Sequence, residues 1–223
     1  MDQENPRSFD QIPDCHCRAG GAASGFLCPA ASLAVAGCKV RQRGHAGSPD
    51  HGGGYFLQFP RALEIGTAHG GTLLFLTRLA SPQATIVSID LPGGKFGGGY
   101  SSRRSWFYQR FALRRQCLYL LRGNSHSNEM LDQVKSAFKD HPVDYLFIDG
   151  DHRYEGVKSD FEMYGPMVRK GGLIAFHDIA DGPSEFVGGV PEFWREIRAR
   201  YRYMEFIKDH KQEGLGIGVL YVE

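Results

Sequence analysis

The stretch VDYLFIDGDHRYEGVKSDFEMYGPMVRKGGLIAFHDI, residues 143–179, decides the fold. It begins with the apolar run Val143–Ile148, which is typical of a parallel strand buried on both faces. Apolar side chains at helical spacing follow over Tyr154–Val168, and Gly171-Gly172 predicts the end of that helix. A second apolar run, Leu173–Phe176, predicts the next strand. The pattern therefore indicates two parallel strands joined by a helix.

Acidic and imidazole side chains follow both of these predicted strands. Because the carboxyl ends of parallel strands form the edge at which open α/β sheets bind ligands, these side chains are expected to converge there. The group comprises Asp149, Asp151, His152, His177 and Asp178. The sequence thus predicts a polar site at one rim of the sheet.

The rest of the chain continues the alternation of strands and helices. Further strands are predicted at Arg61–Gly66, Thr85–Asp90, Cys117–Leu121, Tyr203–Ile207 and Ile217–Val222. Further helices are predicted at Gly70–Ala80, Trp106–Arg115, Met130–Phe138 and Pro191–Tyr201. This order predicts a doubly wound α/β sheet with helices on both faces and an added hairpin-like end.

Composition narrows the class of protein. The 223 residues, 42% of them hydrophobic, suffice for one sizeable core. A net charge of +1, from 26 basic and 25 acidic residues, gives no electrostatic reason to expect nucleic acid or an anionic membrane as a partner. No apolar run is long enough to span a bilayer. Five cysteines, an odd count, favour reduced thiols and a cytoplasmic location over a disulfide scaffold.

Residues 1–55 differ from the rest because they are rich in Gly, Ala, Ser and Pro and lack periodicity. They predict a poorly ordered leader ahead of one domain at 56–223. Cys15, His16, Cys17, Cys28 and Cys38 could hold zinc, but their spacing matches none of the usual ligand patterns. Val35–Cys38 is similar to a lipoprotein processing site, yet the segment before it is acid-rich where a signal peptide needs positive charge.

The turn after the first strand indicates the kind of cofactor. Its candidate residues are Glu64, Gly66, Thr67, Ala68 and Gly70, and Asp90 at the end of the second strand can accept both ribose hydroxyls. A dinucleotide fingerprint would need glycine where Ala68 stands. Glu64 suits an ammonium group better than a phosphate. The turn therefore favours S-adenosylmethionine over NAD, and a tight turn without a ligand is the alternative.

From Arg61 onward, the motifs LEIGTAHGG, SIDLPGG, FIDGDHRYEGV and GGLIAFHDI resemble those of class I S-adenosylmethionine-dependent methyltransferases, in particular the cephalosporin hydroxylase-like small-molecule O-methyltransferases. The resemblance implies a seven-stranded Rossmann-like sheet and an adenine contact near Ser125. It also implies a divalent metal, Mg or Mn, with ligands at Asp149, His177 and Asp178. His177 departs from the oxygen ligand usual at its position.

Such a site can activate an alcohol. A cation on Asp149 would lower the pKa of a coordinated hydroxyl, and His152 could take its proton. In the other interpretation, Asp151-His152 caps the helix that begins at Tyr154. The expected acceptor is a small hydroxylated molecule, a sugar or natural product, bound between the loop Leu91–Ser102 and the aromatic segment Ser105–Phe111.

Two other classes of function fit parts of the pattern. His152, His177 and one carboxylate form the ligand set of a non-haem iron oxygenase. A non-catalytic binding module with the same sheet is the second alternative, although a retired site has no need for clustered, mutually repelling carboxylates. The sequence leaves open whether the chain forms a homo-oligomer.

Overall fold

The computed structural model describes residues 58–93, 99–209 and 213–223. The predicted leader at 1–55, the cysteine-rich zinc set and the lipoprotein-like site all lie outside the described residues. The same holds for residues 94–98 of the predicted acceptor loop.

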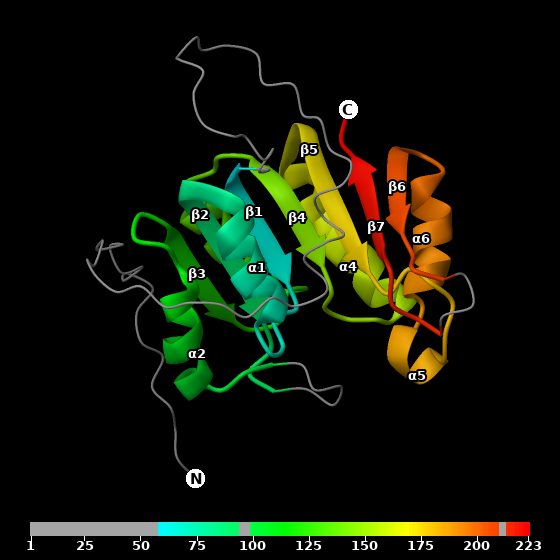
Figure 1. The fold of residues 1–223 in the computed structure, drawn as a ribbon, viewed down its shortest axis with the longest axis horizontal. Coiled ribbons are helices and arrows are strands. Elements are labelled where there is room, and N and C mark those ends of the chain that lie inside the picture. The colour runs from blue at the N-terminus through cyan, green and yellow to red at the C-terminus, as the bar shows by residue number, and fades with distance from the viewer. Residues whose placement is uncertain (1–57, 94–98, 210–212) are drawn as a thin grey trace.

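Seven strands form one sheet in the order β3-β2-β1-β4-β5-β7-β6 (Figure 1). The strands are β1 (Phe59–Ile65), β2 (Ala80–Asp90), β3 (Cys117–Arg122), β4 (Val143–Ile148), β5 (Val168–His177), β6 (Arg202–Phe206) and β7 (Ile217–Tyr221). The first five are parallel, and β7 runs antiparallel to both of its neighbours. The predicted doubly wound α/β sheet, with its hairpin-like end, is confirmed.

Helices cover both faces of the sheet. In Figure 1, α1 (Gly71–Leu79) lies in front of the sheet and α4 (Tyr154–Tyr164) behind it. The remaining helices are α2 (Ser102–Tyr108), α3 (Asn128–Ala137), α5 (Ser184–Val187) and α6 (Val190–Arg198), with 3₁₀ turns at Gln109–Phe111 and Gly165–Met167. One core cluster packs the sheet against α1 and α2, and a larger one packs it against α3, α4 and α6. Burial on two faces explains the near-continuous apolar runs of the central strands.

The helix predicted to reach Val168 is shorter than expected. α4 ends at Tyr164, and a 3₁₀ turn with Pro166 follows it, because proline has no N–H to continue the helical ladder. β5 then begins at Val168, five residues before the predicted start. Gly171 and Gly172 therefore do not end a helix; they lie where the pairing of β4 with β5 shifts register. Gly171 has φ +74°, a conformation that suits glycine.

The predicted helix Trp106–Arg115 is also displaced. α2 begins at Ser102, with Ser101 as its N-cap, and continues as a 3₁₀ turn only to Phe111. None of the described helices is both long and apolar enough to cross a membrane.

The strand order reverses between β1 and β4, which is the point where open α/β sheets form their ligand crevice. Here the two strands are joined beyond their ends, because Asp149 N donates a hydrogen bond to Ile65 O over 2.8 Å. The turn after β1 and the segment after β4 therefore start side by side.

Candidate active site

The turn after β1 packs directly on the segment after β4. Gly66 has φ +91°, and a Cβ on it would lie 1.9 Å from Asp149 O, so only glycine fits there. Ala68 also adopts a positive φ, of 42°. The backbone of this turn is therefore held in a conformation that most residues avoid.

Asp90 holds the turn in place through its side chain. One oxygen, Oδ2, accepts hydrogen bonds from Thr67 N at 2.9 Å and from Ala68 N at 2.6 Å. The other, Oδ1, accepts from Leu91 N at 2.7 Å and from Gly99 N at 2.9 Å. Asp90 as a whole is 8% exposed. Four backbone donors thus already meet Asp90, and its contact with ribose hydroxyls stays a prediction.

Glu64 lies fully buried beneath this turn. Its Oε2 accepts a hydrogen bond from Ser88 Oγ at 2.7 Å, while Oε1 has no hydrogen-bond partner among the described residues. Ser88 also bonds the hydroxyl of Thr67. Burial raises the pKa of Glu64 to about 8, although the bond from Ser88 lowers it. Glu64 therefore offers an unpaired oxygen to a cationic ligand group.

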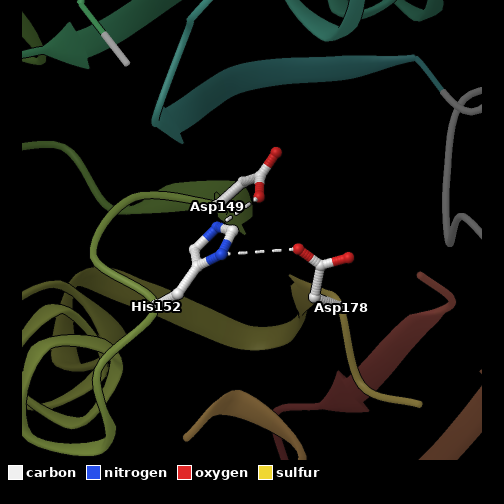
Figure 2. A group of neighbouring side chains, drawn as sticks. All are labelled: Asp149, His152 and Asp178. Carbon is white, nitrogen blue, oxygen red and sulfur yellow. Dashed lines mark ion pairs between the residues drawn. The ribbon is translucent and has the colours of Figure 1, made fainter. Parts of the chain in front are cut away.

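A second cluster lies at the ends of β4 and β5, where Figure 2 shows the His152 ring between Asp149 and Asp178. His152 Nε2 is 3.4 Å from Asp149 Oδ1, and its Nδ1 is 3.6 Å from Asp178 Oδ2. His177 Nδ1 lies 3.4 Å from Asp149 Oδ1 and 3.1 Å from Asp178 Oδ1. Two carboxylates and two imidazoles therefore meet within contact distance.

The carboxylates and imidazoles shift one another's pKa values. The bond to Asp149 raises the pKa of His152 to about 9. Burial lowers the pKa of His177, but Asp149 and Asp178 outweigh it and raise the value to about 10. Burial likewise raises the pKa of Asp149, and the two histidines outweigh it, so the net pKa lies below the usual range. With no other cation present, the histidines carry the compensating charge at neutral pH.

His152 is fixed by α5, which the sequence reasoning missed. Its Nδ1–H donates to Phe186 O at 2.6 Å, which leaves Nε2 facing Asp149. The segment can approach because Gly188 and Gly189 have no side chains: a Cβ on Gly188 would lie 2.2 Å from His152 O. A Gly-Gly pair shortly after the polar rim is the sequence signal that could have found this contact.

The group of residues suited to a metal ion differs from the predicted set. Ligand atoms of Asp149, His152 and Asp178 all lie within 4.8 Å of one another. The predicted third ligand, His177, contacts both carboxylates from the side of β5. Carboxylate oxygens with one imidazole nitrogen fit manganese, iron or zinc, and a cation would offset the repulsion between the carboxylates.

Asp151 does not join the cluster. Its carboxylate binds the Arg153 guanidinium through both oxygens and accepts a hydrogen bond from Arg153 N at 3.0 Å, just before α4. The N-cap of α4 is Arg153, which makes no side-chain cap hydrogen bond, so neither Asp151 nor His152 caps the helix. Asp151 instead holds the turn before it. Of the five side chains expected at the rim, four converge.

The other predicted site residues lie in the loop after β3 and in α2. Ser125 lies in the loop after β3, where its carbonyl accepts the hydroxyl hydrogen of Tyr164 at 2.7 Å. In the predicted aromatic wall, Trp106 is 64% exposed and stacks under Arg110, whereas Tyr108 is buried. Tyr108 donates its hydroxyl hydrogen to Ala68 O at 3.0 Å. Within α2, Tyr108 is the aromatic residue with a hydrogen bond to the turn after β1.

Two sequence relatives are short matches. The chain is 54% identical over 39 residues to the uncharacterized protein R132 of Acanthamoeba polyphaga mimivirus and 33% identical over 93 residues to the uncharacterized protein y4gI of Sinorhizobium fredii. The matches cover 18% and 42% of this chain. They span 18% of the first relative's length and 9% of the second's.

Solved structures share the fold at low sequence identity. An O-methyltransferase from Bacillus cereus in complex with SAH matches with a TM-score of 0.54 and 20% identity, over 73% of this chain and 74% of that one. Cofactor-bound Rv0187 from MTB gives 0.56 and 18%, over 74% and 73%. The TDP-rhamnose 3'-O-methyltransferase CalS11 gives 0.54 and 18%, over 73% and 71%. These matches confirm the Rossmann-like methyltransferase fold.

A protein-family model shows to which family the chain belongs. The model describes a methyltransferase domain and matches residues 63–179, more than half of the chain. The matched region begins in β1 and ends just after β5, so it contains both the turn at Gly66 and the cluster at Asp149. The chain belongs to this methyltransferase-domain family, within the class I S-adenosylmethionine-dependent methyltransferases that its motifs resemble.

Proposed function

We propose that this chain transfers the methyl group of S-adenosylmethionine to a hydroxyl oxygen of a small hydroxylated molecule, a sugar or natural product, with the help of a divalent cation. The observation that carries the proposal is the contact between Gly66 and Asp149 O, which joins the turn after β1 to the acid–imidazole cluster. A donor on the turn and an acceptor at the cluster would share one crevice. The SAH complex and the sugar O-methyltransferase among the structures of the same fold support this assignment.

The turn after β1 would bind the donor, which supplies a methyl group on a positively charged sulfur. Glu64 offers its unpaired Oε1 to the ammonium of the methionine part, and this charge would bring the raised pKa of Glu64 down. Asp90 keeps the amides of Thr67 and Ala68 in place. Ser125 lies in the loop that would contact adenine.

The cluster would orient and deprotonate the acceptor. Asp149, His177 and Asp178 would hold the divalent cation, which lowers the pKa of a hydroxyl that it binds. His152 would then take the proton at Nε2, because its Nδ1–H is committed to Phe186 O. A cation on the carboxylates also removes the negative charge that keeps the His152 ring protonated. The residues whose ligand atoms lie closest together, however, are Asp149, His152 and Asp178. In the competing assignment, His152 would therefore bind the cation and His177 would take the proton.

An oxygenase is the second candidate, favoured by one observation: both imidazoles lie 3.4 Å from the same oxygen, Asp149 Oδ1. Two histidines and one carboxylate can bind iron in this way. Nothing in the comparisons supports it. A cytoplasmic location and action without nucleic acid or a membrane stay predictions beside the main proposal.

Calorimetry with S-adenosylmethionine and with 2-oxoglutarate separates the candidates. We expect binding of the first and none of the second, followed by methyl transfer to hydroxylated sugars or natural products that rises when Mg or Mn is added. Binding of 2-oxoglutarate with iron would favour the oxygenase. Binding of S-adenosylmethionine without transfer to any member of the libraries would favour a binding module. Full transfer by chelated, metal-free protein would refute the cation and leave His152 to activate the hydroxyl.

A further inference from the structure

Two residues of α4 hold the loop after β3. Tyr164 binds Ser125 O through its hydroxyl, as described above. One turn earlier on the same face of α4, Asp160 Oδ1 lies 3.2 Å from His126 Nε2. Both α4 residues are fully buried. Consecutive residues of the loop are thus fixed by positions i and i+4 of one helix.

Asp160 depends on His126 for its counter-charge. Its side chain is 0% exposed, and neither oxygen has a hydrogen bond among the described residues. Its Oδ2 faces Gly150, where an added Cβ would lie 3.1 Å away. Within the part of the chain that the structure describes, His126 is its one ion-pair partner. Because a buried, unpaired carboxylate is costly, the pair is expected to persist in its charged form.

The surroundings of His126 favour its protonated form. The contact with Asp160 raises the pKa of His126 above its usual range, although partial burial lowers it. Asp151 adds to this effect from the segment before α4. Arg153 and Glu155, of opposite charge, line the same open pocket of about 390 Å³ as His126. Because the charges of Arg153 and Glu155 oppose each other, the protonated His126 ring is stabilised mainly by Asp160.

We propose that the Asp160–His126 ion pair positions the loop from Asn124 to Ser127 to receive the adenine ring of the methyl donor. Both members are thus positioning residues for donor binding. The inference rests on the proposed function, since it takes the donor to bind at Ser125. When His126 loses its proton, Asp160 is left buried without a counter-charge, and the loop loses one of its two attachments to α4. The same carboxylate lies next to Gly150, in the segment that carries Asp149.

Replacement of His126, whose side chain is partly exposed, tests the proposal without removing a core residue. We expect His126→Gln to raise the Kd for SAH, and the KM for the donor, by about tenfold or more, because the loop loses its ion pair with buried Asp160. Turnover at saturating donor should change by less than about twofold, because the acid–imidazole cluster is untouched. Asp160→Asn should weaken binding in the same way where it folds. His141→Gln, which replaces an exposed histidine just before the amino end of β4, is the matched control.

The pH dependence supplies a readout that a merely structural role would not move. Affinity of the wild type should fall as the pH rises through the raised pKa of His126, above 6.5. This step should be missing in His126→Gln, while Glu64 and His152 titrate in both proteins and cancel in the difference. The NMR titration of the His126 ring should move to lower pH in Asp160→Asn. Equal SAH affinity and equal pH profiles in wild type and His126→Gln would overturn the inference, whereas a wild type that binds no SAH would overturn the proposed donor and this inference with it.

Discussion

The two halves of the rim handle buried charge in opposite ways. At the ends of β1 and β2, Asp90 meets four backbone N–H groups, and Glu64 is buried deeply enough to have a pKa of about 8. At the ends of β4 and β5, half-buried Asp149 and buried Asp178 face imidazoles instead of backbone N–H groups. The first half is a frame fixed by hydrogen bonds before a ligand arrives. In the second half, a bound cation could replace the histidines as the positive charge that offsets the carboxylates.

This contrast predicts that changes at the cluster impair chemistry and changes at the frame impair binding. The largest effect should come from Asp149→Ala. Loss of this carboxylate removes the proposed cation ligand and the partner of both histidines, so turnover should fall by about 1,000-fold or more, while SAH affinity stays within about threefold. Methyl-transfer kinetics and calorimetry measure the two quantities.

Asp181→Ala is the control for this change. It removes an exposed carboxylate that pairs with Arg195 in the segment after β5. Turnover should be unaffected. If Asp149→Ala lost SAH affinity by as large a factor as it lost turnover, the separation of frame and cluster would be wrong.

Asp90→Asn should have the next largest effect. An amide cannot accept from four N–H donors, and its NH₂ group would face two of them, so the turn at Thr67 and Ala68 should lose its fixed geometry. We expect the Kd for SAH to rise by about 10- to 100-fold, with a loss of about 2–3 kcal/mol in unfolding free energy. Calorimetry and denaturant unfolding measure both, with exposed Asp132→Asn as control. Undiminished binding would show that the frame does not hold the donor.

His177→Asp should change which cation is preferred. Replacing an imidazole nitrogen by a carboxylate oxygen favours hard cations, so relative affinity should shift from manganese toward magnesium by about tenfold. Competition between the two metals, followed by elemental analysis, measures the shift. An unchanged preference in His177→Asp, together with a shift in His152→Asp, would assign the ligand role to His152 instead.

The smallest effect should be a change in the number of protons that are released when the donor binds next to Glu64. With a pKa of about 8, Glu64 is mostly protonated at pH 7, and an ammonium group beside Oε1 would ionise it. Donor binding at pH 7 should therefore release close to one proton, measured by calorimetry in buffers of different ionisation enthalpy. Glu64→Gln should release about one proton fewer. Equal release by both proteins would place the ammonium elsewhere.

The raised pKa of Glu64 also predicts how the free energy of unfolding changes with pH. Its folded pKa of about 8 lies above the ordinary value of 4.5, so the folded state binds more protons between these values. The contribution to stability is fully present below pH 4.5 and is lost progressively as the pH rises from 4.5 through 8, by an amount on the order of 5 kcal/mol. Thermal unfolding of Glu64→Gln should show a flatter decline over this range than the wild type.

Local pattern sufficed for the order of elements. Apolar runs such as Val143–Ile148 and the polar residues that follow them are adjacent in the chain, so strand, strand end and rim could be predicted together. The end of α4 was predicted too late because Pro166 and the pairing of β5 compete with helical periodicity over the same residues. Boundaries depend on such competition, and periodicity alone does not resolve it.

The sequence by itself determined the α/β alternation, the family motifs and four of the rim residues, because each depends on side chains close together in the chain. Tertiary structure alone decided the contacts between distant segments. His152 is oriented by Phe186, Asp90 accepts hydrogen bonds from backbone amides, and the pKa of His126 is raised by its contact with Asp160. The reason is physical: protonation and hydrogen-bond partners depend on burial, and burial is set only when segments far apart in the chain pack together.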